Sequence, residues 1–412
     1  MSERDSPHRI APQPWMTEPG TEAVLEALAA GGVEARFVGG SVRDALLARP
    51  IGDIDIATPA PPERVMELLE KRGIKVVPTG IAHGTVTAIT GTPPRHFEIT
   101  TLRRDVETYG RRARVAFDAD WAADAARRDF TINAIYLDPD GAIHDPVGGL
   151  ADLQARRVRF VGDPATRIAE DVLRILRYYR FEARFGTGSG DPSARVASQA
   201  AAHLLPTLSA ERIAQELTTL IETRDPMSAF RMMQEDGVLT VVLPEASRLD
   251  RLQKMIAIEP QPDPLRRLAA LIDVDDAGAA AVAERLRFSN AWRDRLRGLT
   301  APWPLNPVGD IKAQRQALYR LGAERYRDLA LLSAAEGWMT PQRLAELIAL
   351  ADHWVAPVFP LTGRDVTALG IPPGPEIGRL LTAVHEWWEA GDFTADRAVC
   401  LAKLRSLVAA RN

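Results

Sequence analysis

The hydrophobic pattern of the chain changes near Gly149, and this change constrains the fold more than any other feature. Between residues 23 and 148, short strand-like segments such as IGDIDIAT, GTVTAIT and HFEITTLR alternate with helical segments. Beyond residue 165, apolar residues recur at helical spacing and prolines separate the segments. The sequence therefore predicts an α/β head with a mixed sheet and helices, followed by an all-α neck, body and tail.

We predict four parts along the chain. Residues 1–22 are polar and proline-rich without a hydrophobic signal core, which predicts a flexible N-terminal leader. Residues 23–148 form the α/β head, and residues 149–240 form a helical neck. Residues 241–412 form a helical body and tail. No apolar run reaches the ~18 residues that a membrane-spanning helix requires, so no membrane partner is expected.

Charge and cysteine content narrow the environment and the partners. The net charge of −4 argues against a basic coat over the whole surface, but it allows a local arginine track. The single cysteine, Cys400, excludes an internal disulfide and fits a reducing cytosol, so a cytoplasmic location is expected. The seven histidines form no metal-ligand or nucleophile pattern. No protein partner is evident from the sequence.

The segment DIDI places two carboxylates at alternate positions of a predicted strand. Asp53 and Asp55 then share one face, while Ile54 and Ile56 pack on the other. Two ionised carboxylates so close repel each other, and a divalent cation between them relieves the repulsion. Hard oxygen ligands favour Mg²⁺. The alternative is a strand face or turn that carries solvated aspartates, and the motif alone leaves both open.

A glycine turn precedes this strand in the sequence. Gly39, Gly40 and Ser41 are predicted between a strand and a helix, where backbone N–H groups can approach a phosphate. Arg43 can add a charge-assisted contact. The alternative is a tight turn with Ser41 as helix N-cap. The third glycine of the dinucleotide-binding motif is missing, which disfavours a nicotinamide oxidoreductase. A phosphate cradle beside a metal pair indicates nucleotidyl transfer.

Five stretches of the chain, in order, resemble motifs of the class II nucleotidyltransferases, which include bacterial-type CCA-adding enzymes and bacterial poly(A) polymerases. They are GGSVRD with DIDIAT, ARRDFTINAI (126–135), HDPVGGLADLQ (144–154), EDVLRILRYYRF (170–181) and SAERIAQEL (209–217). The resemblance covers residues 36–245, and the remainder matches in general character. It implies a polymerase-β-like nucleotidyltransferase head, a neck with a nucleotide-selecting helix, and a body and tail that bind tRNA.

In EDVLRILRYYRF, Asp171, Arg174 and Arg177 are predicted at spacings of three on one helix. The resemblance implies that Asp171 and Arg174 pair with the incoming base, and that Arg177 and Arg180 contact its triphosphate. A carboxylate and a guanidinium match the amine donor and ring-nitrogen acceptor that cytosine and adenine share. Uracil and guanine would leave polar groups unpaired. The alternative is an amphipathic helix with a solvated Asp–Arg face.

The resemblance also implies roles for other residues of the head. Arg128 would contact the triphosphate or ribose and Asp129 would orient its neighbours; the alternative is a loop held by an Arg–Asp ion pair. Glu98, in HFEITTLR, is a candidate third catalytic carboxylate or an ordinary polar strand residue. Residues 102–115 resemble the family's flexible loop, which is linked to the switch from C to A addition; the alternative is a solvated surface loop.

The sequence thus predicts an enzyme that adds CCA to the 3′ end of tRNA from CTP and ATP without a template and releases pyrophosphate. Two Mg²⁺ ions held by Asp53 and Asp55 would activate the terminal 3′-hydroxyl and steady the triphosphate. One alternative is a poly(A) polymerase, although the interval GIAHGTVTAITGTPPRHF resembles the CCA-adding branch. Others are an A-only or CC-only enzyme, and a non-catalytic RNA-binding protein, which both aspartates disfavour.

Overall fold

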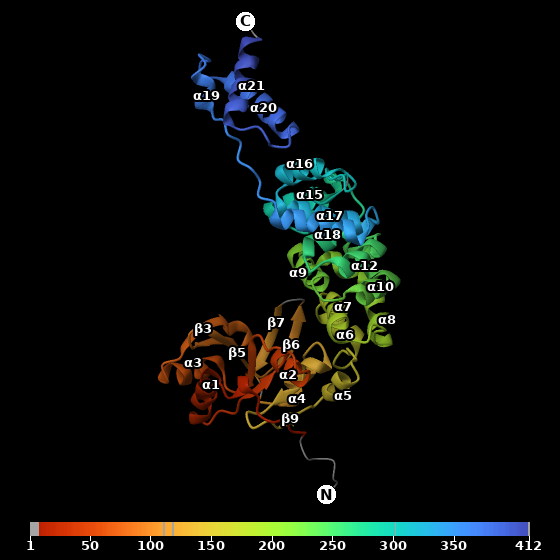
Figure 1. Cartoon of the computed structure of the whole chain (residues 1–412). Coiled ribbons are helices and arrows are strands. Elements are labelled where there is room, and N and C mark those ends of the chain that lie inside the picture. Colours follow the sequence, from red (N-terminus) through yellow and green to blue (C-terminus); the bar gives the residue numbers. More distant parts are fainter. Residues whose placement is uncertain (1–7, 110–111, 118, 301, 411–412) are drawn as a thin grey trace. The chain divides into compact units, whose positions relative to one another are not determined.

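The structure is a computed structural model that describes residues 8–109, 112–117, 119–300 and 302–410 (Figure 1). The chain divides into two compact units, Met1–Pro244 and Glu245–Asn412. The N-terminal unit contains the sheets and the neck helices, and the C-terminal unit is helical. Among the described residues, no helix combines the length and the apolar character needed to cross a lipid bilayer.

The head part of the N-terminal unit contains a seven-stranded mixed sheet (Figure 1). Its strand order is β3-β4-β5-β2-β1-β8-β9. The neighbours β2 and β5 run parallel, and the other neighbouring pairs are antiparallel. The strands are β1 (Arg36–Val38), β2 (Ile54–Thr58), β3 (Lys75–Gly80), β4 (Thr85–Thr90), β5 (Arg95–Thr101), β8 (Tyr136–Leu137) and β9 (Ile143–His144). This arrangement confirms the mixed sheet predicted for the head.

The predicted alternation in DIDI is present in β2. Ile54 and Ile56 are fully buried, whereas Asp55 is partly exposed on the opposite face and Asp53 lies exposed just before the strand. The helix α3 packs against β3, β4 and β5, and α1 packs against α3 (Figure 1). The helices of this region are α1 (Pro19–Ala30), α2 (Gly40–Leu46), α3 (Pro62–Lys71), α4 (Trp121–Ala126), α5 (Gly149–Gln154), and the 3₁₀ turns η1 (Pro14–Met16), η2 (Ile81–His83) and η3 (Thr131–Asn133).

The flexible leader predicted for residues 1–22 is wrong from His8 onward. Trp15 and Met16 are buried, and the Trp15 ring meets the Phe37 ring edge-on at a centroid distance of 4.7 Å. Burial of such large apolar side chains contributes about 1.5–3 kcal/mol each, which holds the segment on the head. Residues 1–7 lie outside the described residues, and there the leader stays a prediction.

The loop predicted for residues 102–115 is also wrong at the level of the backbone. Two strands, β6 (Arg103–Tyr109) and β7 (Arg112–Phe117), pair antiparallel in a separate two-stranded sheet. Backbone hydrogen bonds between two strands require no apolar periodicity, so the charged sequence gave no strand signal. Residues 110 and 111, between the strands, lie outside the described residues.

The neck follows the head within the same unit and is helical, as predicted. The continuous helix predicted through residues 170–181, however, is interrupted at Asp171, whose backbone is extended (φ −152°, ψ 105°). The Asp171 side chain accepts the N–H of Leu173, and its carbonyl accepts the N–H of Arg174, so a new helix starts there. The elements are α6 (Pro164–Glu170), α7 (Arg174–Phe185), α8 (Pro192–Ala201), η4 (Ala202–Thr207), α9 (Ala210–Ile221), α10 (Met227–Glu235) and α11 (Val238–Val242).

The C-terminal unit has its own apolar cores. In its last part, Trp388, Val384 and Leu404 are buried, and the Tyr319 ring packs against them from an earlier helix. Among the described residues of this unit, Ala246 and Ile272 form an isolated antiparallel bridge. The helices are α12 (Leu249–Ile258), α13 (Pro264–Leu271), α14 (Asp276–Arg285), α15 (Asn290–Gly298), α16 (Ile311–Leu321), α17 (Ala323–Glu336), α18 (Pro341–His353), α19 (Gly363–Thr367), α20 (Pro375–Ala390) and α21 (Arg397–Ala409).

Candidate active site

Two carboxylates stand side by side on the parallel pair of strands. Asp55 in β2 is the register partner of Glu98 in β5. Neighbouring strands lie about 4.8 Å apart, and register partners present their side chains to the same face. Burial raises the pKa of Asp55 to about 6, and the negative charge of Glu98 adds to the shift while Arg128 opposes it. The structure thus brings Glu98 beside Asp55, and Asp53 contributes a further negative charge.

The glycine turn between β1 and α2 adjoins this carboxylate. Gly39 has a φ of +72°, and a Cβ built on it would lie 2.8 Å from Oδ2 of Asp55. The backbone N–H of Gly40 donates to the Asp55 carboxylate. Ser41 is buried, and its hydroxyl donates to the carbonyl of Val38 at 3.1 Å. Gly39 is the N-cap of α2, so the alternative that placed Ser41 there is wrong.

Arg43 lies buried beneath the glycine turn. It donates to the Asp44 carboxylate through two nitrogens at 3.1 Å and to Oδ1 of Asn133 at 2.7 Å. Its guanidinium carbon lies 4.1 Å from the centroid of the Phe185 ring on α7. Burial lowers the pKa of Arg43, although Asp44 opposes the shift. Arg43, the predicted phosphate contact, therefore also joins the head to α7.

A buried acid that sequence reasoning missed positions Arg128. Asp124, 1% exposed, accepts hydrogen bonds from Arg127, Arg128 and the hydroxyl of Tyr136. Arg127 and Arg128 follow Asp124 by three and four residues, at the C-terminal end of α4. Residues at this spacing are neighbours on a helix, so the pattern WAADAARRD was the signal that could have predicted the contact. The pKa of Tyr136 is raised by burial, so its hydroxyl remains a donor to Asp124.

Asp129 connects the head to α7. Its carboxylate accepts from Arg177 at 2.5 and 3.0 Å, from the side chain of Asn133 at 3.0 Å and from the N–H of Phe130 at 2.8 Å. Burial alone would raise the pKa of Asp129, but the charge of Arg177 and the hydrogen bonds outweigh it and lower the pKa to about 2. Asp129, which was predicted to orient its neighbours, thus contacts Arg177. The contact of Asn133 with Asp129 was not predicted from the sequence.

The segment from Asp171 to Arg180 is held by the helix behind it. Oδ2 of Asp171 accepts from Arg212 of α9 at 2.7 Å, and Arg180 donates to Glu216 of the same helix at 2.5 Å. Arg174 donates to Glu170 at 2.5 Å and to the carbonyl of Arg127 at 3.4 Å. The motif SAERIAQEL therefore supplies Arg212, which holds Asp171, and Glu216, which holds Arg180, the predicted triphosphate contact. The roles of Arg212 and Glu216 were not predicted.

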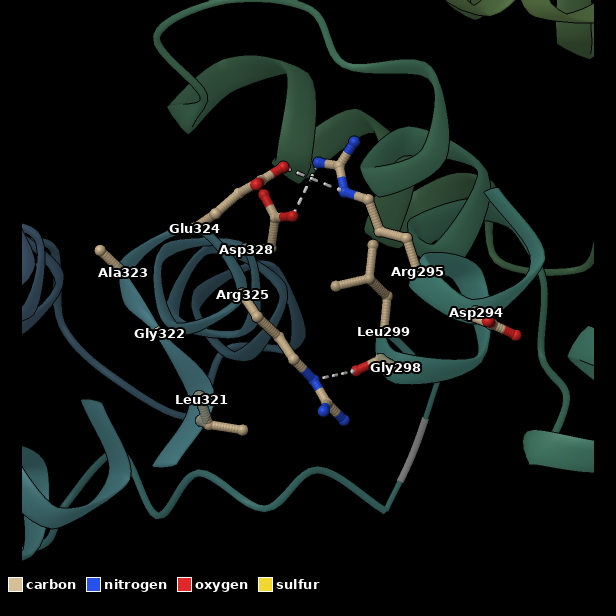
Figure 2. Close-up of a pocket in the computed structure, with 10 residues that line it drawn as sticks. All are labelled: Asp294, Arg295, Gly298, Leu299, Leu321, Gly322, Ala323, Glu324, Arg325 and Asp328. Carbon is tan, nitrogen blue, oxygen red and sulfur yellow. Dashed lines mark hydrogen bonds and ion pairs between the residues drawn. The ribbon is translucent and has the colours of Figure 1, made fainter. Parts of the chain in front are cut away.

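The pocket shown in Figure 2 belongs to the C-terminal unit and not to this site. It has a volume of about 430 Å³ and lies between α15 and the junction of α16 and α17. Figure 2 shows Arg295 directed toward Glu324 and Asp328, at 3.5 and 2.8 Å, and Arg325 bonded to the carbonyl of Gly298. The carboxylates of Glu324 and Asp328 in this pocket thus both pair with Arg295.

Comparisons with known proteins match this chain to two family models and to solved structures. A family model described as the poly A polymerase head domain matches residues 35–159. A second, described as a probable RNA and SrmB-binding site of polymerase A, matches residues 191–249. The crystal structure of the Bacillus stearothermophilus CCA-adding enzyme in complex with CTP is 28% identical, has a TM-score of 0.79, and matches over 96% of this chain and 99% of that one.

Full-length relatives agree with these matches. Mitochondrial CCA tRNA nucleotidyltransferase 1 of Mus musculus is 32% identical over 94% of this chain and 90% of its own length. The CCA-adding enzyme of Lactobacillus delbrueckii subsp. bulgaricus is 33% identical over 93% of this chain and 97% of its own length. The chain belongs to the family of CCA-adding enzymes, the CCA tRNA nucleotidyltransferases.

Proposed function

We propose that this enzyme adds CMP, CMP and AMP in turn to the 3′ end of tRNA, using CTP and ATP and releasing pyrophosphate. The observation that carries the proposal is the carboxylate pair of Asp55 and Glu98 packed against the positive-φ turn at Gly39. It combines the acidic centre of a nucleotidyl transfer site with a backbone turn suited to a phosphate. Family membership and the CTP complex of the Bacillus relative support the substrates.

The donor set fits Mg²⁺. Among the described residues, no group of three or more histidine, cysteine, aspartate or glutamate side chains lies close enough to hold a metal ion. Mg²⁺ does not need such a cage, because it binds through one or two carboxylates together with substrate phosphates. Asp53 and Asp55 would hold it, and the raised pKa of Asp55 reflects burial and crowded negative charge that a cation relieves. When bound, Mg²⁺ would lower the pKa of the 3′-hydroxyl and stabilise the triphosphate charge.

Other residues of the chain would bind the phosphates and the ribose of the nucleotide. The turn at Gly39 and Gly40 lets the phosphates approach the backbone, and Arg43, which lies 3.6 Å from the position of a Cβ on Gly40, adds positive charge there. We assign Arg128 and Arg177 to the triphosphate or ribose, positioned by Asp124 and Asp129. Arg180 would complete this set, with Glu216 as its support.

Selection of the base would rest on Asp171 and Arg174. Asp171 uses one oxygen for Leu173 and the other for Arg212, and each carboxylate oxygen has two lone pairs, so it can accept a further bond from an exocyclic amine. Arg174 is fixed by Glu170 and two backbone carbonyls, which sets the direction of its remaining donors. A site fixed in this way accepts C and A and rejects bases with a carbonyl at the amine position.

The setting of the reaction follows from the family and the composition. The relatives include bacterial and mitochondrial enzymes, and the buried Cys400 fits a reducing compartment. We place this enzyme in the cytoplasm. Its helical body and tail would hold the tRNA through backbone contacts that recognise shape rather than sequence.

The test uses two variants, Asp53→Ala and Asp55→Ala, with a tRNA transcript that lacks CCA. Each variant should lose CMP transfer while its affinity for the transcript, measured by filter binding, stays near that of the wild type. An exposed carboxylate variant of α3, Glu67→Ala, serves as the control and should keep full activity. Continued turnover by both aspartate variants would overturn the assigned chemistry.

A further inference from the structure

A buried amide links a proposed nucleotide contact on α2 to another on α7. Asn133, at the end of the turn η3, is 8% exposed. Its Oδ1 accepts from Nη1 of Arg43 at 2.7 Å, and its Nδ2 donates to Oδ1 of Asp129 at 3.0 Å. Asp129 also accepts two bonds from Arg177. Through Asn133, a line of hydrogen bonds thus runs from α2 to α7.

The charges of its two neighbours leave the Asn133 amide one orientation. A guanidinium only donates, so Arg43 requires the amide oxygen, and an ionised carboxylate only accepts, so Asp129 requires the NH₂ group. Burial would raise the pKa of Asp129, but the charge of Arg177 and the hydrogen bonds lower it to about 2, so Asp129 is ionised at neutral pH. An amide offers both groups side by side, whereas an ionised aspartate only accepts and a leucine does neither.

The turn that carries Asn133 is itself fixed. The hydroxyl of Thr131 donates to the buried carboxylate of Asp152 at 2.6 Å, and the N–H of Asn133 donates to the carbonyl of Phe130 at 3.0 Å. The backbone of Gly149 packs so closely that a Cβ there would lie 2.1 Å from the carbonyl oxygen of Thr131. Asn133 therefore holds its two neighbours from a rigid base.

Both neighbours of Asn133 act on the proposed nucleotide site. Arg43 donates two bonds to Asp44, so with the bond to Asn133 three of its five N–H groups have partners among the described residues. The third bond fixes the rotation of the guanidinium beneath the glycine turn. Asp129 fixes Arg177 in the same way. Because Arg43 and Arg177 come from different helices, the contacts through Asn133 help to set the distance between them.

Buried amides also serve purely structural roles, and Gln314 of α16 is an example. It is 1% exposed, its Oε1 accepts from the hydroxyl of Tyr326 at 2.7 Å, and its Nε2 donates to the carbonyl of Asn306 at 2.7 Å. These partners are neutral and belong to the C-terminal unit. Asn133 instead lies between two opposite charges of the proposed nucleotide site. A structural amide affects stability alone, whereas a positioning amide also changes nucleotide affinity.

We propose that Asn133 is a positioning residue for nucleotide binding. It fixes Arg43 directly and Arg177 through Asp129, at the separation that the phosphates and ribose of the incoming nucleotide require. Its donor and its acceptor are both needed, because one partner is a cation and the other an anion. This inference rests on the proposed function.

The experiment replaces the amide by a carboxyl group of the same shape, in Asn133→Asp. When ionised, the new group faces Asp129 as a second carboxylate, and when the pair shares a proton, the donor returns. The other charges that face this position are Arg43, Arg177 beyond Asp129, and Arg128, whose Nη1 donates to the carbonyl of residue 133 at 3.5 Å. Repulsion from Asp129 raises the pKa of the new group against these arginines, so nucleotide affinity should recover toward about pH 5.

Affinity is measured as the Kd of labelled CTP, with Mg²⁺ and without tRNA. Relative to the wild type, Asn133→Asp should raise Kd about thirtyfold at pH 8 and about threefold at pH 5. Asn133→Ala lacks both contacts at every pH and should raise Kd about tenfold throughout. The matched control is Gln314→Glu, which loses its donor to the carbonyl of Asn306 at pH 8. It should unfold at a lower urea concentration than the wild type and bind CTP equally well.

Urea unfolding at each pH shows whether the variants are folded. If Asn133→Asp is unfolded at pH 8, Asn133→Ala supplies the comparison. CTP affinities within about twofold of the wild type in both variants would leave Asn133 a structural role and overturn the proposal. An equal loss at both pH values in Asn133→Asp would also overturn it, because the donor to Asp129 would then not matter. If the wild type binds CTP but adds no CCA to tRNA, the proposed function fails, whereas the affinity comparison still decides the role of Asn133.

Discussion

The substitution Gly39→Ala tests the contact between the glycine turn and the carboxylate pair. Gly39 has a φ of +72°, where an L side chain is strained, and its Cβ would lie 2.8 Å from Oδ2 of Asp55. Real Cβ atoms almost never approach a neighbour under 3.0 Å, so the Asp55 side chain or the turn must move. The variant therefore combines two separable effects, backbone strain and displacement of the carboxylate.

Backbone strain lowers the stability of the fold, whereas displacement of the carboxylate lowers the rate of the reaction. Strain at a positive φ costs about 1–2 kcal/mol of stability. A displacement of catalytic groups approaching 1 Å costs about a hundredfold in rate. The matched control is Gly32→Ala, because Gly32 has a φ of +70° and nothing within 4 Å of its added Cβ. Gly32→Ala should lose about as much stability as Gly39→Ala and keep its activity.

The assay is single-turnover CMP incorporation at saturating CTP, together with urea unfolding of both variants. We expect both to unfold at lower urea concentrations than the wild type, and we expect only Gly39→Ala to lose about two orders of magnitude in rate. If Gly39→Ala transferred CMP within about threefold of the wild type, the argument that this turn sets the position of Asp55 would be refuted.

Three further predictions concern residues around this centre. Asp124→Asn leaves two arginines facing a neutral amide and should lower the free energy of unfolding by about 3 kcal/mol, measured in urea; a loss below about 0.5 kcal/mol would contradict it. Burial raises the pKa of Glu182 in α7 to about 7, so the folded state keeps a proton that the unfolded chain releases near pH 4.5. Wild-type stability should thus fall by about 3 kcal/mol between pH 4.5 and 7, and Glu182→Gln should remove this part of the pH dependence; identical pH profiles would exclude it. Asp171→Ala should reduce the preference for CTP over UTP at least tenfold, measured as the ratio of kcat/KM values, and an unchanged ratio would count against base pairing with Asp171.

Much of the head could be predicted because its signals are local. The alternation in DIDI is a property of the strand itself, and Ile54 and Ile56 are buried as the pattern required. The partnership of Asp55 with Glu98 was less accessible. It depends on the parallel register of two strands separated by a helix and two other strands, and side-chain alternation alone cannot fix that register.

The errors have local causes as well. Spacing suggested one helix through Asp171, but an aspartate side chain that bonds the backbone two residues on competes with the helix and begins a new one. The charged segment after residue 102 lacked the apolar alternation by which strands are recognised, yet its backbone pairs as a hairpin. Trp15 and Met16 were the signals against a free leader, since apolar side chains of that size are seldom left in solvent.

The supporting residues were the hardest to predict. Asn133 contacts Asp129 across only four residues, but Asn133 reaches Arg43, and Glu216 reaches Arg180, from far along the chain, and only the folded structure brings these last two pairs together. The sequence motifs contained all of these residues without indicating which pairs meet. Such contacts are tertiary, so no periodicity in the sequence records them.

The most direct test of the account is the sequence of the product. A tRNA transcript lacking CCA would be incubated with the enzyme, Mg²⁺ and all four nucleoside triphosphates at equal concentration, and its 3′ ends would be sequenced. The account predicts that CCA is added and that extension stops there. Long runs of A, termination after CC or a single nucleotide, or frequent U or G at these positions would contradict it.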